Sequence, residues 1–460
     1  MQYRMSGRHL GLLAMIIWGG AILALGLVSF EPYRLDEGAA RGLLLNWSVV
    51  DNIASPIVIF GLPDFRALFF IPLGLYWSGS IIAAKVYTLM MAFSAILLLY
   101  SWSRKISGIE AALISSALLA ISPLMITQVD AIGAGPYLLL IFGLGAWLDK
   151  TYRAAQRPLS GWFFLQLLAV GTSVTLHPAG LAYPLALMWR WYKDPTDARQ
   201  KRHVLIGATL ITTIVLIMRL GWPDIAWWNN PVATLGLVNL GNPLEEPSWI
   251  VGVLSSTLLL LVLWLERRAL LNDLMGTMLL LSLLIGLAAA DATWAMLALV
   301  LVLYRGVPRL IATNKTSMMG RYGVVMIVML IVSMSFMLAD KSYARIIQDG
   351  ELSPEDQLIK LLAMEASDTK QPFRAASQWP ARTMIACKRD VLPLPPPAKD
   401  GETLLKTIKG ITHLTFNPYN PAFRELGRNI AQLGAATQTL ALQQGGVIIK
   451  IRQPAKPAAQ

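Results

Sequence analysis

Long apolar blocks, separated by short polar connectors, constrain the fold of this chain more than any other feature. A helix needs about 20 apolar residues to cross the hydrocarbon core of a bilayer. Only 14% of the 460 residues are charged, whereas about a quarter of the residues in a soluble domain are charged. We therefore expect a mainly α-helical, polytopic membrane bundle of about eleven spans. The predicted spans are residues 10–30, 81–102, 110–127, 131–148, 159–176, 178–191, 203–220, 248–265, 269–290, 292–304 and 322–338.

The basic residues are distributed unequally between the connectors on the two sides of the predicted membrane. Up to residue 338, one set of connectors holds 18 lysines and arginines, beginning with Arg4 and Arg8. The alternate set holds five. Because cytoplasmic connectors carry the excess of basic residues, we expect a cytoplasmic N-terminus and a C-terminal segment on the outer side of the plasma membrane. The first span, too long for a signal-peptide core, is predicted to be retained as an anchor.

The net charge of +12 does not indicate a nucleic-acid partner. Most of the basic residues lie in connectors, where they face the head groups of membrane lipids. The basic residues show no interleaving with aromatic residues of the kind that binds nucleic acid. The single cysteine, Cys387, forms no internal disulfide and fits no cysteine-based metal site.

The composition becomes polar after residue 338, which predicts a small extracytoplasmic α/β domain over residues 339–452 and a disordered tail over 453–460. Residues 354–366, 402–409 and 421–433 are predicted to form helices. Residues 383–387 and 411–416 are predicted to form strands, and 392–397 an extended linker. Residues 437–443 and 447–452, on either side of two glycines, indicate a closing hairpin.

The transmembrane domain, residues 1–338, is predicted to have two long outer loops. The loop 221–247 contains three tryptophans and no lysine or arginine, which is typical of an interfacial aromatic belt; a lip that stacks on sugar or lipid is the alternative. The loop 31–80 is predicted to contain short interfacial helices over residues 42–50 and 66–77.

An acidic pair, Asp36-Glu37, follows the first span directly. It is consistent with an ordinary interfacial turn in which Arg34 neutralises the carboxylates. It is also consistent with a catalytic site, because a carboxylate can accept the proton of an attacking hydroxyl or hold a divalent cation.

Three other polar side chains are predicted on the same side of the membrane. Lys85 alone is typical of a lysine that extends to the interface, and His177 alone is typical of a local hydrogen-bonding residue in a turn. Together with Arg219 they could hold the phosphate of an anionic lipid. Asp130 and Asp291, in short outer turns, are expected to cap helices.

The order of these features resembles the membrane glycosyltransferases with the GT-C fold, in the branch of the protein O-mannosyltransferases and aminoarabinose transferases. The resemblance is carried by Asp36-Glu37, by the run from Gly79 to Tyr87 that enters the second span, and by the basic turn from Ser103 to Gly108. A third span ending in Ser122-Pro123 and the run His177-Pro178-Ala179-Gly180 extend it. It covers about residues 10–190.

The resemblance implies transfer of a sugar from a polyprenyl-phosphate donor to an acceptor on the outer face, with inversion at the anomeric carbon. It implies that Asp36 is the general base or orients the acceptor, and that Glu37 is its partner. At the position of Lys85 the family usually has an arginine, which is thought to contact the carrier phosphate. The first loop also lacks a Lys-Pro-Pro run that is common in the aminoarabinose branch.

Two other classes of function remain open. A non-catalytic membrane scaffold or accessory subunit could retain the same fold. A transporter is disfavoured because the chain has no inverted repeat and few ionisable groups at mid-membrane depth. A cavity rimmed by Asp36 and faced by Lys85 or Arg219 would favour the enzyme, whereas a first loop packed against the C-terminal domain would favour the scaffold.

Overall fold

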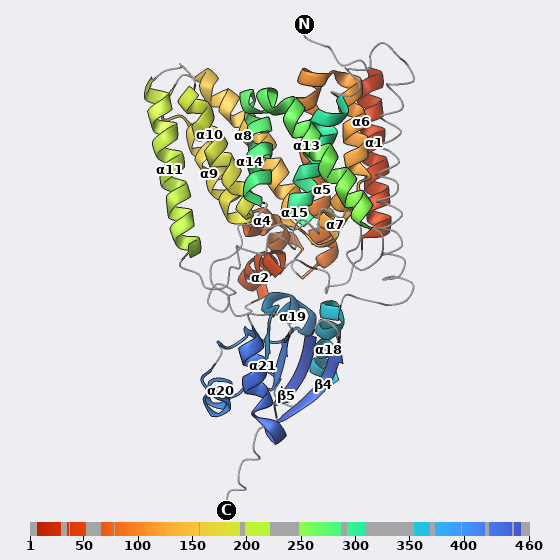
Figure 1. Cartoon of the computed structure of the whole chain (residues 1–460), viewed down its shortest axis with the longest axis vertical. Coiled ribbons are helices and arrows are strands. Elements are labelled where there is room, and N and C mark those ends of the chain that lie inside the picture. Colours follow the sequence, from red (N-terminus) through yellow and green to blue (C-terminus); the bar gives the residue numbers. More distant parts are fainter. Residues whose placement is uncertain are drawn as a thin grey trace, which may run out of the picture. The chain divides into compact units, whose positions relative to one another are not determined.

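The structure, a computed structural model, divides into two compact units (Figure 1). The helical unit comprises residues 1–28 and 84–343, and the C-terminal unit comprises residues 29–83 and 344–460. The described residues are 7–28, 35, 37–51, 66–77, 79–155, 157–193, 198–220, 248–286, 292–308, 354–368, 373–396, 398–418, 423–443 and 446–451.

Helices that follow the predicted apolar blocks build the helical unit. Within it, α9 packs against α8 and α11, α14 packs against α10, α13 and α15, and α1 packs against α6. The helices are α1 (Gly7–Leu27), α5 (Ile81–Ser107), α6 (Ile109–Ala120), α7 (Pro123–Asp130), α8 (Ala134–Ala155), α9 (Gly161–Leu176), α10 (Ala182–Lys193), α11 (Ala198–Leu220), α13 (Ser248–Asn272), α14 (Leu274–Gly286) and α15 (Ala292–Leu301), which continues into the π-helical turn η2 (Val302–Gly306).

Among the described residues, fewer helices than the predicted eleven have the length and composition of a membrane span. Two helices, Arg8–Gly26 and Ile81–Ser107, are long and apolar enough to cross a bilayer. A third is added if Ile109–Ala120 and Leu124–Asp130, which are bent by 49° at their junction, count as one span. Eleven spans are therefore not confirmed. Several other apolar helices have only 10–17 residues, and the predicted span 322–338 lies outside the described residues.

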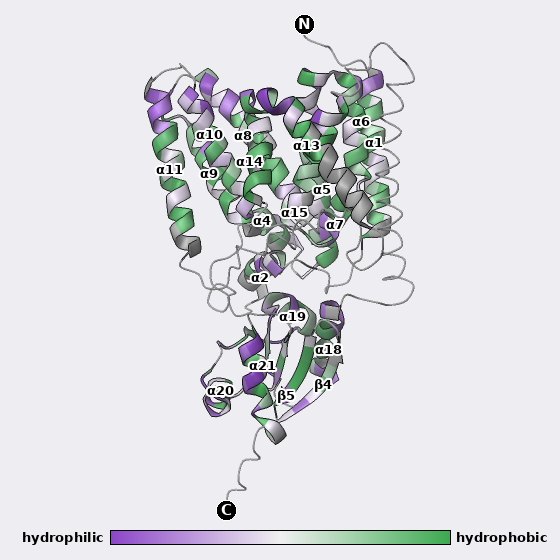
Figure 2. Ribbon diagram, in the orientation of Figure 1, coloured by the Kyte–Doolittle hydropathy of each residue, from purple (hydrophilic) through white to green (hydrophobic). Residues whose placement is uncertain are grey.

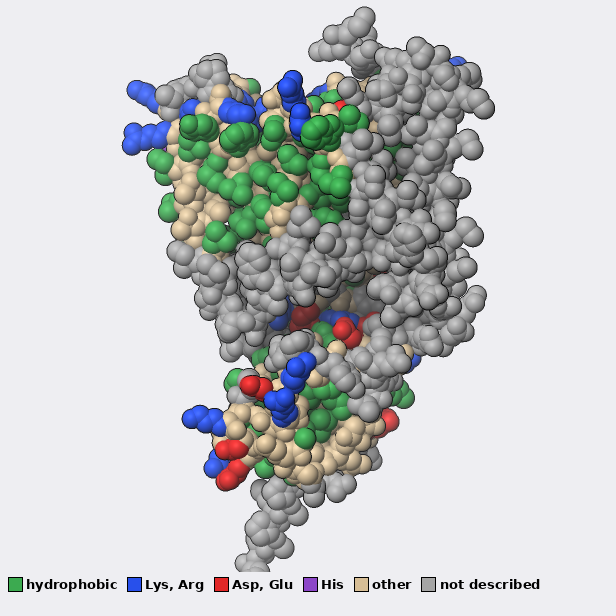
Figure 3. Space-filling view, in the orientation of Figure 1, with side chains coloured by type: hydrophobic (Ala, Val, Ile, Leu, Met, Phe, Trp, Pro, Cys, Tyr) green, Lys and Arg blue, Asp and Glu red, His purple; other side chains and the backbone are tan. Residues whose placement is uncertain are grey.

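Basic side chains gather at one end of the helical unit. Figures 2 and 3 show hydrophilic residues, with Lys and Arg prominent, beside a broad hydrophobic band. In the described part of the helical unit, the last turns at this end contain basic residues: Arg104 and Lys105 in α5, Arg153 in α8, Arg190 and Lys193 in α10, and Arg305 in η2. This arrangement agrees with the charge asymmetry read from the sequence.

The chain turns between α9 and α10 where the sequence predicts an interruption. The 3₁₀ turn η1 (Pro178–Leu181) begins directly after His177. Gly180 packs so tightly here that a Cβ atom would lie 1.7 Å from the carbonyl oxygen of Ser173. The Ser173 hydroxyl donates a hydrogen bond of 3.0 Å to the Gly180 carbonyl. Only glycine fits this close approach of two backbone segments.

The C-terminal unit combines two helices of the first outer loop with a small α/β fold. Helices α2 (Glu37–Asp51) and α4 (Arg66–Tyr76) pack against each other, and α2 packs against α19 (Pro380–Cys387). Both loop helices were predicted. Their grouping with the C-terminal residues differs from the predicted division, which assigned residues 31–80 to the transmembrane domain. Contacts between α2 and α19 are the physical reason.

Five strands form one mixed sheet in the order β2-β1-β3-β5-β4. Strands β2, β1 and β3 are parallel, whereas β3 pairs antiparallel with β5 and β5 with β4. The strands are β1 (Ala375–Ser377), β2 (Val391–Pro393), β3 (His413–Phe416), β4 (Thr437–Gln443) and β5 (Gly446–Ile451); the other elements are α18 (Pro354–Asp368), α20 (Gly401–Thr407), α21 (Arg424–Ala431) and η4 (Gly434–Ala436). The core contains Leu404, Leu414, Phe416 and Leu426.

Most of the predicted elements of this unit are confirmed, and one is wrong. Residues 383–387, predicted as a strand, lie in helix α19. Pro380 occupies the first turn of that helix, where its fixed φ favours helix initiation. Burial against neighbouring elements then outweighs β propensity. Part of the predicted linker forms β2, which tolerates Pro393 because it is an edge strand. The predicted disordered tail lies outside the described residues.

Candidate functional site

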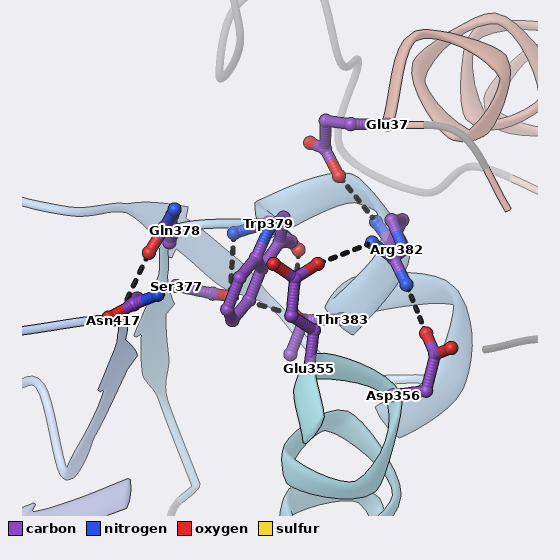
Figure 4. A network of polar contacts seen from close by, with 9 residues as sticks. All are labelled: Glu37, Glu355, Asp356, Ser377, Gln378, Trp379, Arg382, Thr383 and Asn417. Atoms are coloured by element: carbon purple, nitrogen blue, oxygen red, sulfur yellow. Dashed lines mark hydrogen bonds and ion pairs between the residues drawn. The ribbon is translucent and has the colours of Figure 1, made fainter. Parts of the chain in front are cut away.

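Glu37 is the residue of the predicted acidic pair that the structure describes, and it binds the N-terminus of α19. Its Oε1 accepts a hydrogen bond of 2.9 Å from the Ala381 amide. Its Oε2 accepts one of 3.2 Å from the Arg382 amide, which Figure 4 draws. These amides lie in the first turn of α19, where no intrahelical acceptor is available. A carboxylate also interacts favourably with the positive end of the helix dipole. Glu37 therefore acts as a cap on a helix that is 344 residues away in the sequence.

Arg41 lies one turn after Glu37 on α2, and its Nε is 3.6 Å from Glu37 Oε1. Burial raises the pKa of the Glu37 carboxyl, whereas Arg41 and the two amides of α19 oppose that rise. The side chain retains an exposed fraction of 21%. The site thus holds a partly desolvated carboxylate that is balanced by one cation and a helix N-terminus.

The side chain of Arg382 connects α19 to α18. Its guanidinium pairs with Asp356 through Nη2 and lies 3.7 Å from Glu355 Oε2 through Nη1. These two acidic residues lie in the first turn of α18. Their contact with Arg382 was not predicted, since it joins residues that lie 26 positions apart.

Hydrogen bonds hold the N-terminus of α19 on the sheet. The Ser377 hydroxyl lies 2.8 Å from the Thr383 hydroxyl and accepts a bond of 2.9 Å from the Trp379 amide. Thr383 Oγ1 also donates to the Trp379 carbonyl. The Gln378 side chain accepts a bond of 2.8 Å from the Asn417 amide (Figure 4). The bond between Gln378 and Asn417 joins the loops after β1 and β3.

This network lies at the carboxyl ends of β1 and β3, where the order of the strands reverses. The chain leaves β1 toward β2 on one side and then returns to β3 on the other side of β1. Where strand order reverses in this way, parallel sheets present a crevice at the carboxyl ends of their strands. In this chain the helix N-terminus beside that position is occupied by Glu37.

In the helical unit, Lys85 forms a buried ion pair with Asp130. The distance from Lys85 Nζ to Asp130 Oδ1 is 2.8 Å, and the two side chains are 1% and 6% exposed. Lys85 lies near the start of α5 and Asp130 is the last residue of α7. By the rise of an α-helix, Lys85 is about 29 Å along α5 from Arg104, at the end opposite the basic side chains. The sequence predicted that Asp130 caps a helix. Its ion pair with Lys85 was not predicted.

A strained turn follows Asp130. Ile132 has a φ of 54°, which is unfavourable for a β-branched residue. The Gln128 side chain, which accepts a bond of 3.0 Å from the Gly135 amide, braces the turn from one side. Thr88, one turn after Lys85, bonds to Tyr137 at 2.7 Å. Such strain persists where surrounding contacts over-determine the backbone, and it is concentrated at functional sites.

His177 has the local role that a lone histidine in a turn favours. It is buried, and its Nδ1 accepts a bond of 3.1 Å from the Ala179 amide. That bond places the ring proton on Nε2. His177 therefore caps η1.

The remaining predicted site residues are described only in part. Asp36 and Arg34 lie outside the described residues, as does the loop 221–247. Arg219 lies in the last turn of α11, and its side chain is also outside the described part. Among the residues that the structure describes, no group of three or more His, Cys, Asp or Glu side chains converges as a metal site would require.

Comparison with known proteins gives a result at the level of fold. No protein-family model and no curated protein matches the sequence. The solved structure of ArnT from Cupriavidus metallidurans bound to undecaprenyl phosphate is similar, with 11% identity and a TM-score of 0.53 over 95% of this chain and 98% of that chain.

The archaeal oligosaccharyltransferase from Archaeoglobus fulgidus, in complex with an inhibitory peptide and a dolichol-phosphate, is similar over 98% of this chain and 75% of that chain. Its identity is 11% and its TM-score 0.55. This chain has the GT-C fold. The fold inferred from the run between Gly79 and Pro123 is thereby confirmed. The likeness extends well beyond residues 10–190, the region in which the sequence shows it.

Proposed function

We propose that this GT-C protein is a membrane glycosyltransferase that uses a polyprenyl-phosphate-linked sugar and acts on the outer face of the membrane. The observation that carries the proposal is the likeness to ArnT bound to undecaprenyl phosphate, because it spans nearly the whole of both chains. The acceptor is a lipid, a glycan or a protein.

In the proposed reaction, Asp36 accepts the proton of the acceptor hydroxyl as its oxygen attacks the anomeric carbon of the donor. The bond from that carbon to the phosphate oxygen breaks, and polyprenyl phosphate leaves with the electron pair. The configuration at the anomeric carbon inverts. Since phosphate leaves well, cations that stabilise its charge are needed more than a general acid. We assign that role to Lys85 and Arg219, with Arg34 and His177 as further contacts to the phosphate.

The geometry around Lys85 adds a condition to this assignment. Its ammonium is already neutralised by Asp130 and is almost completely buried. A phosphate that binds at Nζ would share the cation with Asp130. In this proposal Lys85 and Asp130 act as one unit, with Asp130 holding the ammonium in position and Lys85 meeting the carrier.

The proposed orientation has a cytoplasmic N-terminus and an outer C-terminal unit in the plasma membrane. The basic side chains at one end of the helical unit support it, because such residues accumulate on the cytoplasmic side. A reporter that is active only after export, fused after residue 340, should be active. If a reporter that is active only in the cytoplasm is active at this position, the proposed orientation is wrong.

A non-catalytic scaffold is the second candidate, and one observation favours it. Helix α2 packs against α19, and Glu37 is engaged by the amides of α19. A first outer loop that serves only to anchor the C-terminal unit would have such contacts. The same contacts are compatible with an enzyme if Asp36, rather than Glu37, performs the chemistry.

Transfer can be measured without knowledge of the natural sugar, because every donor releases the same carrier. Proteoliposomes with the full chain would receive a panel of undecaprenyl-phosphate monosaccharides and acceptor lipid extract, and released undecaprenyl phosphate would be measured by mass spectrometry. We expect Asp36→Asn to abolish release and Asp51→Asn, a matched change at the end of α2, to retain it. Release by Asp36→Asn at the wild-type rate would exclude the catalytic assignment, and an inactive wild-type chain would favour the scaffold.

A further inference from the structure

We infer that Glu37 and Arg382 are positioning residues through which the C-terminal unit orients Asp36 for catalysis. This inference rests on the proposed function, and it changes the role that the sequence suggested for Glu37. Its carboxylate has two backbone donors and one guanidinium partner. A carboxylate held in this way is poorly placed to exchange a proton with Asp36. It is well placed to anchor the chain beside it.

The anchor point is close to the catalytic residue along the chain. Asp36 immediately precedes Glu37, and adjacent Cα atoms are about 3.8 Å apart. Glu37 is the first residue of α2, so its side-chain contacts fix the start of that helix. One planar peptide bond separates the two residues, so fixing Glu37 is expected to limit the backbone positions open to its neighbour.

The N-terminus of α19, to which Glu37 binds, is itself held by the polar contacts drawn in Figure 4. The amides of Ala381 and Arg382 belong to a helix that Ser377, Thr383 and Trp379 tie to the end of β1. Arg382 ties the same turn to the first turn of α18 through Asp356. A carboxylate bound to this turn therefore takes its position from the sheet and from α18 together.

Two features of this contact are accounted for together if Glu37 positions Asp36. The N-terminus of α19 stands at the strand-order reversal, where α/β sheets commonly bind a ligand, and the chain supplies its own carboxylate there. That carboxylate comes from the dipeptide that contains the proposed base. The proposed task of the C-terminal unit in transfer is therefore to fix Glu37, the residue that follows the base in the sequence.

The test compares Glu37→Gln, Arg382→Met and Arg382→Lys in the full chain in proteoliposomes, with the undecaprenyl-phosphate monosaccharide that gives turnover. We expect Glu37→Gln to lower kcat by on the order of 100-fold, while KM for the donor changes by less than about 2-fold, because ground-state binding is untouched. Arg382→Met should lower kcat by roughly 10-fold, with partial recovery in Arg382→Lys. Glu402→Gln is the matched control, since Glu402 is an exposed carboxylate on α20 of the same unit; it should retain wild-type kcat.

Hydrogen exchange supplies the readout of docking. The amides of Ala381 and Arg382 should exchange faster in Glu37→Gln, while those of β5 remain protected. Unchanged kcat in Glu37→Gln, or unchanged exchange at these two amides, would overturn the inference while leaving the role of Asp36 intact. Transfer that survives Asp36→Asn would instead remove the proposed function, and this inference with it.

Discussion

Each of the two units of this protein holds a partly or fully buried carboxylate, and the partners that hold it differ between the units. In the helical unit, Asp130 is neutralised by the side chain of Lys85 in an almost fully buried pair. In the C-terminal unit, Glu37 is held mainly by backbone amides at a helix N-terminus and keeps some contact with solvent. A side-chain partner can be lost by one substitution, whereas backbone donors cannot. We therefore expect the first arrangement to be sensitive to mutation of either partner and the second to be sensitive mainly to Glu37 and to whatever holds α19.

The largest effect is expected when Asp130 is replaced. Asp130→Asn leaves the Lys85 ammonium buried without its counter-charge, and breaking a buried pair in this way costs about 3–5 kcal/mol. Thermal unfolding in detergent should show a large loss of stability. The double variant Lys85→Met with Asp130→Asn removes the orphaned charge and should recover much of it. Equal stability of the single variant and the wild type would show that Asp130 does not compensate Lys85.

A smaller effect is expected from the network that holds α19. Thr383→Val keeps the shape of a fully buried side chain but removes its bonds to Ser377 and to the Trp379 carbonyl. Loss of such buried bonds costs about 1–3 kcal/mol. Burial raises the pKa of the Cys387 thiol to about 12, so pulse labelling of this single cysteine during a thermal ramp reports opening of the unit. Thr407→Val, at an exposed position of α20, is the control.

Acidification should weaken the C-terminal unit by a moderate amount. Burial, aided by Lys450, lowers the pKa of His413, so the folded state resists protonation there. As pH falls below about 6.5, the unfolded chain binds the proton more readily and stability decreases. The hydrogen bond from Lys450 lowers the pKa of Glu365, and its stabilising contribution is lost as pH falls below about 4.5.

The raised pKa of Glu37 acts in the opposite direction, because the folded state takes up a proton there more readily than the unfolded chain as pH falls toward its ordinary value. The net effect can be followed by the labelling rate of Cys387, normalised at each pH to that of the unfolded chain. His413→Gln should remove the part of the dependence that begins near pH 6.5. A wild-type chain with a flat profile between pH 7 and about 5 would contradict this assignment.

The smallest effect is expected at the exposed pair Lys406 and Glu402 on α20. The two groups are 3.4 Å apart, but their side chains are 76% and 82% exposed. Pairs of this kind contribute less than about 0.5 kcal/mol. Lys406→Gln should leave the thermal midpoint within the error of the measurement. A loss comparable to that of Thr383→Val would show that exposure is a poor guide to energetic weight in this unit.

The sequence by itself determined the helical architecture and much of the small domain. Apolar blocks predicted helices such as α5 and α9 with close boundaries, and turn residues predicted the hairpin of β4 and β5. These features depend on patterns within a short stretch of chain. The break at His177-Pro178 was likewise visible, because proline disfavours continuation of the preceding helix.

Only the tertiary structure decided which charged groups meet. Lys85 pairs with Asp130, which lies 45 positions away in the sequence, and Glu37 binds the Ala381 amide of α19, which lies 344 positions away. It also decided that residues 380–387 are helical, although residues 383–387 were predicted to form a strand. Local propensity is worth a fraction of a kcal/mol per residue, whereas burying a large apolar side chain stabilises by about 1.5–3 kcal/mol and removing one partner of a buried charge pair costs about 3–5 kcal/mol. Contacts of that strength override local preference, and they join positions whose proximity no local pattern records.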